Sequence, residues 1–372
     1  MRAAVFKGPG EVTVEERAVP ALGPADVLLE VSHCGVCGSD VHFALDGWVR
    51  PGTVGGHEWS GRVVALGAEV TDWTIGDLAV GGPSTKCGEC EFCQSGRSSL
   101  CARRNAIGED DESDGAFAEF VRQPAAQLLR PPENVSARHA ALTEPLAVSL
   151  HAITRAGARP GQRLLITGCG PIGALAVAAA RARGVTDIVV SEPAPLRRAL
   201  AERLGAQVVT PDELQTPRSP NQLVAEPFDA ALECSGKGVA IEAALGQLGR
   251  TGTLVLVGAG MDQPRFDPNR ILLNELIVTG AFTYDDGGFE AALELLSTPG
   301  FPVDDLVEPD DVPLDDLLPA VTRLHAGEVA GKILISPRVR SGERPGGAKP
   351  LGRSRVASPP GGAAEPREAG RS

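Results

Sequence analysis

A glycine-rich turn between a predicted strand and a predicted helix constrains the fold of this chain more than any other segment. Residues 164–167 form a short apolar run, residues 168–173 read Gly-Cys-Gly-Pro-Ile-Gly, and an alanine-rich helical stretch follows. In a G-x-G-x-x-G turn the first glycine permits a tight turn, the second lets a diphosphate approach the backbone, and the third lets the helix pack on the strand. The diphosphate then rests on the N-terminal amides of the helix. The expected cofactor contacts in this turn are Gly168, Gly170, Pro171, Ile172 and Gly173.

An acidic residue completes this nucleotide-binding pattern. Glu192 directly follows the next predicted strand, residues 187–191. A carboxylate at that position can hold both ribose hydroxyls and repels a 2′-phosphate, which favours NAD over NADP. Arg197 and Arg198 follow within two helical turns and could offer a cation to a phosphate, so NADP stays open. Further expected cofactor contacts, near the end of a later strand, are Val257 and Gly258.

The pattern of apolar and turn-forming residues changes near residue 149. Before it, short alternating runs are separated by Gly and Pro, which predicts many short strands in a small barrel-like domain. After it, strands alternate with helices, which predicts an α/β domain with a doubly wound parallel sheet. A basic, Gly- and Pro-rich tail with almost no large apolar residues is expected to be disordered. The expected division is 1–148 for the β-rich domain, 149–288 for the nucleotide-binding domain, 289–337 for a C-terminal segment and 338–372 for the tail.

A mixed set of metal ligands lies in the first domain. Cys37, His57 and Glu58 offer a thiolate, an imidazole and a carboxylate, a set that Zn²⁺ accepts with one position left for water or substrate. Ser39 and His42 lie between them and could pass a proton from a buried alcohol to solvent. The alternative for this segment alone is a buried cysteine and a surface histidine in a glycine-rich loop.

Four further cysteines form a second candidate metal site. Residues 87–101 carry them at the spacing C-x2-C-x2-C-x7-C. Four thiolates close a tetrahedral structural zinc site and leave no position for chemistry, whereas an iron–sulfur cluster or idle cysteines are the alternatives. We favour zinc, which would cross-link a loop too polar to fold alone. The expected ligands are Cys87, Cys90, Cys93 and Cys101.

Composition excludes several classes of partner. A formal net charge of −13 argues against nucleic acid or an anionic membrane as a partner, and 4% aromatic residues leave few platforms for base stacking. The first residues contain no long apolar run, so we expect no signal peptide, and the longest apolar stretch, 175–180, is too short to span a bilayer. In that context the eight cysteines suggest metal ligands and buried thiols in a cytoplasmic protein.

In this order, the motifs resemble those of zinc-containing medium-chain alcohol and polyol dehydrogenases over residues 1–337. The resemblance implies a GroES-like catalytic domain carrying the structural zinc lobe, a Rossmann domain, and an active site between them. It also implies that the C-terminal segment, with Lys332 in its last strand, returns to the catalytic domain. Two zinc ions per chain, NAD and a small alcohol or ketone are the implied ligands. Such relatives form homodimers or homotetramers, here expected through residues 277–281.

Within this family, the third ligand of the catalytic zinc varies. Alcohol dehydrogenases supply a second cysteine, whereas residues 143–146 read Thr-Glu-Pro-Leu here, similar to sorbitol, butanediol and threonine dehydrogenases. Cys37 and His57 are therefore the expected ligands, and Glu58 and Glu144 stay open for the third place. Glu144 has an alternative role as a cap of the helix that follows it. We also expect Asp40 to accept a hydrogen bond from the ring of His57.

The resemblance implies the reversible oxidation of a secondary alcohol of a polyol or cyclitol to a ketone, through a zinc alkoxide and hydride transfer to nicotinamide. Ser39 would take the hydroxyl proton and pass it, through the ribose hydroxyl, to His42. Phe282 matches the nicotinamide side, but Thr283 stands where sorbitol dehydrogenases have arginine, which puts sorbitol in doubt. Residues 56–61 and 191–195 resemble those of cyclitol dehydrogenases, such as 2-deoxy-scyllo-inosamine dehydrogenases, more closely.

Competing functions remain at this point. A threonine 3-dehydrogenase or a simple secondary-alcohol dehydrogenase would share the same motifs. The same fold also serves zinc-free quinone or enone reductases that use NADPH, and non-catalytic binding or structural relatives. The intact metal motifs argue against the last two.

Overall fold

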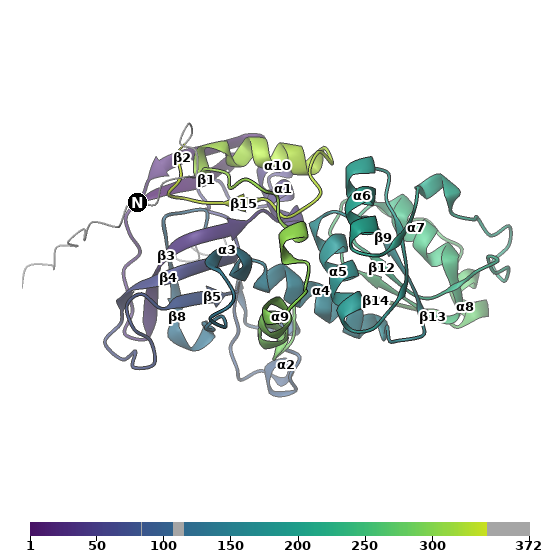
Figure 1. Ribbon diagram of the computed structural model, residues 1–372, viewed down its shortest axis with the longest axis horizontal. Helices are drawn as coiled ribbons and strands as arrows, with labels where there is room; N and C mark the ends of the chain where they lie inside the picture. The colour runs from purple at the N-terminus through teal and green to yellow at the C-terminus, as the bar shows by residue number, and fades with distance from the viewer. Residues whose placement is uncertain (83, 107–114, 341–372) are drawn as a thin grey trace, which may run out of the picture.

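The computed structural model describes residues 1–82, 84–106 and 115–340, and most of the predicted tail, from residue 341 on, lies outside this part of the chain. Two sheets form the two ends of an elongated molecule (Figure 1). Helices α4 (Thr143–Ala156), α5 (Pro171–Ala182) and α9 (Gly288–Ser297) lie between the sheets. Helix α4 packs on strands of both sheets, so it joins the two halves of the molecule and runs across the expected boundary at 148/149.

The second half contains a six-stranded parallel sheet in the order β11-β10-β9-β12-β13-β14. Numbered within this domain, that is the order 3-2-1-4-5-6 of a doubly wound nucleotide-binding fold, which confirms the predicted fold class. The order reverses between β9 and β12, so a crevice for a ligand opens at the carboxyl ends of these two strands. The strands are β9 (Arg163–Thr167), β10 (Asp187–Ser191), β11 (Gln207–Val209), β12 (Phe228–Glu233), β13 (Leu248–Leu256) and β14 (Ile277–Gly280).

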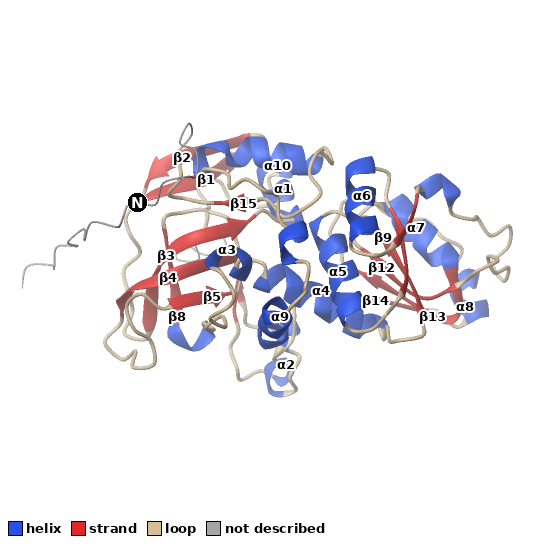
Figure 2. Cartoon of the chain, in the orientation of Figure 1, coloured by secondary structure: helices blue, strands red, loops and turns tan. Residues whose placement is uncertain are grey.

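Helices cover both faces of this parallel sheet (Figure 2). In β9, Leu164 and Ile166 belong to the core shared with α4, α5 and α6, whereas Leu165 belongs to the core shared with α7. Strands buried on both faces are expected to be continuously apolar, as β9 and β10 are. The remaining helices of this domain are α6 (Pro195–Arg203), α7 (Gly238–Gln247) and α8 (Asn269–Asn274).

The first half contains a mostly antiparallel β structure. Its main sheet has the order β15-β3-β4-β5, with β8 paired to β3, and two hairpin-like pairs lie beside it. The last strand pairs with β3, so the C-terminal segment returns to the first half of the molecule. The strands are β1 (Arg2–Gly8), β2 (Glu11–Glu16), β3 (Asp26–Gly35), β4 (Glu58–Leu66), β5 (Leu78–Gly81), β6 (Ser84–Thr85), β7 (Asn105–Ala106), β8 (Phe120–Pro124) and β15 (Leu334–Ile335).

Short helices connect these strands, and they include a π-helical turn at His42–Asp46 directly after α1. Helix α10 packs against α1, and α1 begins directly after Cys37. The short helices are α1 (Gly38–Val41), α2 (Glu91–Gln94), α3 (Ala137–Ala140) and α10 (Leu317–His325), with 3-10 turns at 98–100, 125–127, 211–213, 303–306 and 314–316.

Strand register brings the ends of three strands together. Gly35, at the end of β3, pairs with Glu58 at the start of β4 and with Leu334 of β15. The residues just beyond these ends therefore meet at one point, although they are far apart along the chain. Helix α4 contacts both β4 and strands of the parallel sheet.

Candidate active site between the two sheets

A thiol, an imidazole and a carboxylate meet where these strands end. The ligand atoms of Cys37, His57 and Glu58 all lie within 4.8 Å of one another. His57 is 9% exposed and Glu58 is fully buried. One carboxylate oxygen of Glu58, Oε2, is buried and has no hydrogen-bond partner. An acceptor left free beside a thiol and an imidazole fits a metal ion, because an unpaired buried charge is costly.

Gly35 makes room for this carboxylate. A Cβ on Gly35 would lie 2.2 Å from Glu58 Oε2 and 3.2 Å from Lys332 Cδ. Any side chain at this position would displace the carboxylate or the lysine, so glycine is required here by close approach rather than by a positive φ.

A buried lysine holds the other oxygen of Glu58. Lys332 Nζ donates to Glu58 Oε1 at 2.7 Å and to the carbonyl of Val36 at 3.1 Å, and both charged side chains are at most 1% exposed. Burial opposes the charge of Lys332, but the charges of Glu58 and Cys37 raise its pKa above the usual range. The sequence analysis gave Lys332 no role in the site. The available signal was a lysine at the start of the apolar run Lys-Ile-Leu-Ile.

Asp40 does not bind His57, and that prediction is wrong. Asp40 is fully buried, and its Oδ2 accepts from the backbone N–H of Cys37 at 2.8 Å, whereas Oδ1 has no hydrogen-bond partner. The reason is local: Cys37 is the N-cap of α1, and Asp40 at N3 reaches back to it as in a capping box. Burial raises the pKa of Asp40 to about 6, although the charge of His57 opposes the rise.

Glu144 lies close to this group but outside it. It is 5% exposed in the first turn of α4, and no side chain caps that helix, which begins at Thr143. Glu144 therefore lies where an acidic side chain favours the start of a helix, so its alternative role there stays open. Burial raises the pKa of Glu144 to about 7, the charge of His57 opposes this rise, and the charge of Glu58 adds to it. Of the two carboxylates left open by the sequence, Glu58 is the one within the group of ligand atoms.

The charges of the site favour a divalent cation. Three buried carboxyl groups and a thiol lie near His57, and Lys332 is paired with one of them, Glu58. Burying like charges together is unfavourable unless a cation compensates them. A doubly charged, borderline-soft ion would do so with this mixture of donor atoms. The carboxyl groups are those of Asp40, Glu58 and Glu144.

The segment after Cys37 carries the expected proton-relay residues. Ser39 and His42 are separated by one turn, in α1 and in the π-helical turn that follows. His42 Nδ1 lies 2.6 Å from Asp46 Oδ2, and Nε2 lies 3.3 Å from the carbonyl of Ala259 in the parallel-sheet domain. The ring of Trp48 stacks on His42 at 4.1 Å. His42 therefore spans the space between the two domains and is linked to an exposed carboxylate.

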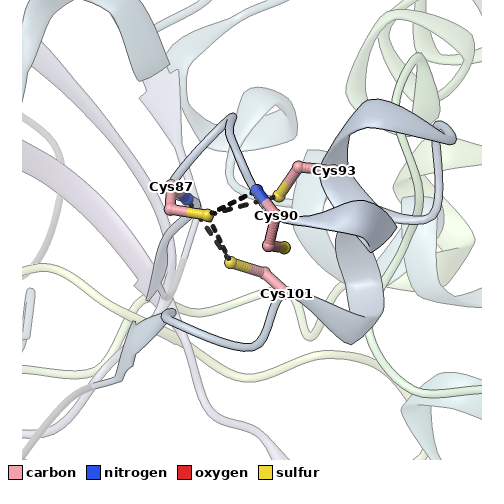
Figure 3. Close-up of side chains that lie close together, drawn as sticks. All are labelled: Cys87, Cys90, Cys93 and Cys101. Atoms are coloured by element: carbon pink, nitrogen blue, oxygen red, sulfur yellow. Dashed lines mark hydrogen bonds between the residues drawn. The ribbon is translucent and has the colours of Figure 1, made fainter.

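The four cysteines of the predicted structural site converge (Figure 3). Their sulfur atoms lie within 4.8 Å of one another, and none forms a disulfide. The backbone N–H of Cys90 points to the sulfur of Cys87 at 3.4 Å, and the N–H of Cys87 points to that of Cys101 at 3.4 Å. Backbone N–H groups of Glu89 and Cys90 lower the pKa of Cys87 to about 6. Donors aimed at sulfur stabilise thiolates, which are the form that binds zinc.

The glycine-rich turn has the geometry that the sequence predicted. Gly168 has φ +86°, and a Cβ there would meet Ser235 at 2.7 Å; a Cβ on Gly173 would meet the Gly168 carbonyl at 2.1 Å. Above Gly170, by contrast, the nearest atoms to an added Cβ belong to Arg197, at 3.9 Å, which leaves room for a ligand at the N-terminus of α5. Cys169 is fully buried beneath the turn.

Glu192 lies beside this turn and is 3% exposed. Its two carboxylate oxygens accept from the N–H groups of Cys169 at 2.7 Å and Ala194 at 2.8 Å. Each oxygen retains a further lone pair for a ribose hydroxyl. The side chain therefore ties the end of β10 to the glycine-rich turn, a role that the sequence analysis missed.

Arg197 has partners within the protein in addition to its expected place beside the cofactor. Its Nε and Nη2 donate to the carbonyls of Val329 and Leu324, at and beyond the end of α10, at 3.0 and 2.9 Å. A guanidinium is attracted to the carbonyl groups at the end of a helix. Only Nη1 faces Gly170. Arg198 is likewise used by the chain itself, because it donates to the carbonyls of Glu192 and Pro193.

The remaining expected cofactor contacts lie around the same crevice. The N–H groups of Val257 and Gly258 donate to the carbonyl of Glu233 at 2.8 and 2.9 Å, and a Cβ on Gly258 would meet the Gly236 nitrogen at 2.2 Å. Phe282 follows β14, is 51% exposed, and lies under the guanidinium of Arg104 at 4.3 Å.

No helix in the described part of the chain is long and apolar enough to cross a membrane.

Comparisons with known proteins agree with this arrangement. Residues 23–133 match the alcohol dehydrogenase GroES-like domain, and residues 171–298 match the zinc-binding dehydrogenase family. A sorbitol dehydrogenase from Bacillus subtilis is 32% identical over 76% of this chain and 82% of its own. The crystal structure of 2R,3R-butanediol dehydrogenase from Bacillus subtilis superposes with a TM-score of 0.80 at 30% identity, covering 91% of this chain and 99% of the other.

A second solved structure carries a cofactor. It is a dehydrogenase of the zinc-binding class from Sinorhizobium meliloti bound to NADP, with a TM-score of 0.79 and 31% identity over 90% of this chain and 99% of the other. Matches of this extent and identity show the family. The chain belongs to the zinc-containing medium-chain alcohol dehydrogenases, and it is an oxidoreductase of that family.

Proposed function

We propose that this protein uses zinc and NAD to oxidise a secondary alcohol of a polyol or cyclitol reversibly to a ketone. The observation that carries the proposal is the group of half-buried Cys37 with buried His57 and Glu58, which has one free carboxylate oxygen. From the same segment as Cys37, His42 reaches the carbonyl of Ala259 in the nucleotide-binding domain. A metal site and a dinucleotide site that share one crevice suit hydride transfer between an alcohol and nicotinamide.

Each member of the site has a role in this proposal. Cys37, His57 and Glu58 would hold the catalytic zinc. Glu144 is near enough for the charge of Glu58 to raise its pKa, so it could exchange with Glu58 as a ligand. A zinc ion held there would supply Lewis-acid chemistry at an alcohol oxygen, and a bound nicotinamide would supply the hydride acceptor. Lys332 donates to Glu58 and holds its carboxylate in place. Cys87, Cys90, Cys93 and Cys101 hold the structural zinc.

Ser39 and His42 carry the proton away. Ser39 would accept it from the alcohol, and His42, one turn later, would take it toward solvent. The ring of His42 lies between two acceptors, Asp46 Oδ2 at 2.6 Å and the carbonyl of Ala259 at 3.3 Å. The side chain of Asp46 is 48% exposed, which gives the proton a route to solvent.

We infer that NAD is the preferred cofactor. The diphosphate would lie against the N-terminal amides of α5, above Gly170. Glu192 would receive the ribose hydroxyls and repel a 2′-phosphate. Two cations that could have held such a phosphate, Arg197 and Arg198, donate to backbone carbonyls instead. The NADP bound to the Sinorhizobium meliloti relative keeps NADP as the alternative.

The proposed substrate class rests on relatives named for alcohols with several hydroxyl groups, sorbitol and 2R,3R-butanediol. Thr283, in place of the arginine of sorbitol dehydrogenases, favours a substrate other than sorbitol, such as a cyclitol. A screen of cyclitols, linear polyols, threonine and simple secondary alcohols for NAD reduction tests this. We expect a cyclitol or polyol to give the highest kcat/KM and Cys37→Ser to abolish turnover.

Two results of this screen would contradict the proposal. A protein that holds zinc but turns over no alcohol would be a non-catalytic relative. A protein that reduces enones or quinones with NADPH after its zinc is removed would belong to the zinc-free reductases.

We also propose a homodimer or a tetramer built from such dimers. Strand β14 is at the edge of the parallel sheet, and Ile277 and Val278 on it are 55% and 39% exposed, beside the exposed Leu272 and Leu273 of α8. An exposed apolar edge strand is a site for pairing with a second copy.

The eight free cysteines suit a reducing compartment, which supports a cytoplasmic location.

A further inference from the structure

Asp285 joins three separate parts of the molecule. Its Oδ2 accepts from Arg97 Nε at 2.9 Å, and its Oδ1 accepts from the backbone N–H of Ser99 at 3.1 Å. His151 Nδ1 lies 3.8 Å from Oδ2. Arg97 and Ser99 belong to the four-cysteine lobe, residues 87–101, and His151 belongs to α4. Asp285 itself follows the last strand of the parallel sheet.

The lobe contacts the neighbours of Asp285 as well. Lys86 Nζ donates to the carbonyl of Tyr284 and lies 4.3 Å from the centre of its ring, and Arg104 covers the ring of Phe282. Tyr284 is 7% exposed, and its hydroxyl fills the space above Gly82, where a Cβ would lie 2.1 Å away. Residues on both sides of the lobe therefore fasten the segment 282–285.

The segment 282–285 has an unfavourable backbone conformation, which contacts with its surroundings must maintain. Thr283 has a φ of +48°, in the left-handed region that a β-branched residue rarely adopts. Strain of this kind persists only where surrounding contacts impose it. Flanking residues Phe282, Tyr284 and Asp285 supply those contacts, and all three contact the lobe or its edge.

Helix α4 links the same junction to the metal site. Glu144 is in its first turn, two turns before His151. Helix α9, which follows the segment 282–285, packs along α4, and the ring of Tyr284 contacts Phe289 of α9 at 4.7 Å. A displacement at Asp285 would therefore reach both the segment at the nicotinamide side and the helix that carries Glu144.

We propose that Asp285 is a positioning residue through which the four-cysteine lobe sets the placement of the segment 282–285 and of α4 for alcohol oxidation. The proposal rests on the proposed function for its kinetic consequence, but its structural consequence can be measured separately. The lobe then has a task beyond stabilising its own loop.

Asp285→Asn tests this, because asparagine keeps the acceptor for Ser99 and removes the ion pair with Arg97. We expect kcat to fall about tenfold, since small misplacements near reacting groups are costly, while the protein keeps both zinc ions. Hydrogen exchange of the amides in 282–288 should become faster. Glu290→Gln, an exposed change of equal charge on α9, is the control and should alter neither quantity.

Arg97→Gln provides a second, milder variant, because the Arg97 side chain is 40% exposed. It should reproduce the fall in kcat, and the double variant should fall no further than either single variant. Unchanged kcat and unchanged exchange in both variants would overturn the proposal. Loss of the structural zinc from Asp285→Asn would also overturn it, because Asp285 would then only support the lobe. If the wild-type protein oxidised no alcohol, the proposed function would fail, whereas hydrogen exchange would still decide the role of Asp285.

Discussion

Replacing Glu192 by glutamine tests how this protein selects its cofactor. Both carboxylate oxygens already accept backbone N–H groups, from Cys169 in the glycine-rich turn and from Ala194. An alanine would remove both acceptors and damage the turn itself. Glutamine keeps the shape and one acceptor, but its NH2 group faces the second N–H, so one charge-assisted hydrogen bond is lost.

The size of the effect on NAD follows from the ribose hydroxyls, which would lose a charged acceptor. A hydrogen bond to a charged group contributes about 1.5–3 kcal/mol, and each 1.4 kcal/mol is a factor of about ten in affinity. The dissociation constant for NAD should therefore rise by roughly 10- to 100-fold. NADP should lose less, because the neutral side chain no longer repels a 2′-phosphate. The ratio of the two dissociation constants should move toward NADP.

Titration of each cofactor by calorimetry or by fluorescence quenching measures this ratio. Glu202→Gln, an exposed change of the same charge on α6, is the matched control and should leave it unchanged. The reasoning is refuted if the wild-type protein binds NADP more tightly than NAD, or if Glu192→Gln leaves the ratio unaltered.

Three further outcomes are expected. In zinc-free protein, Lys332→Met should lower the free energy of unfolding in urea by about 3–5 kcal/mol, because it leaves Glu58 buried without a cation, whereas exposed Lys237→Met should have little effect. His42→Ala should lower kcat by roughly 10²-fold or less and keep its zinc; loss of the metal would make His42 a ligand. Arg270→Met should cost about 3 kcal/mol in the same unfolding assay, because four carbonyls lose their donor; an unchanged midpoint would refute this.

Short-range patterns predicted the fold well because their physical causes are local. The strand 164–167, the three glycines and the proline at the start of α5 lie within ten residues, and each needs only its neighbours to act. The same is true of the four cysteines, whose spacing lets the backbone N–H groups of Cys87 and Cys90 point at the sulfurs of Cys101 and Cys87. Predictions that rest on local geometry of this kind need no knowledge of the rest of the chain.

Contacts between distant segments were harder to predict. Glu58 pairs with Lys332 because β3 aligns Gly35 with both β4 and β15, and no local pattern states that register. Arg197 also donates to the end of α10, which lies within its reach only after the C-terminal segment has returned. Asp40 was expected to bind His57, but the N–H of Cys37, three residues away, is its partner instead.

The zinc content of the wild-type protein and of two cysteine variants tests the central claim most directly. Metal analysis should find two zinc ions per chain in the active wild-type protein. Cys37→Ser should retain one ion and lose alcohol oxidation, because the remaining ion is in the closed four-cysteine site. Cys90→Ser should lose the other ion. Active wild-type protein with one zinc ion or none, or Cys37→Ser protein that keeps two ions and full activity, would contradict the account.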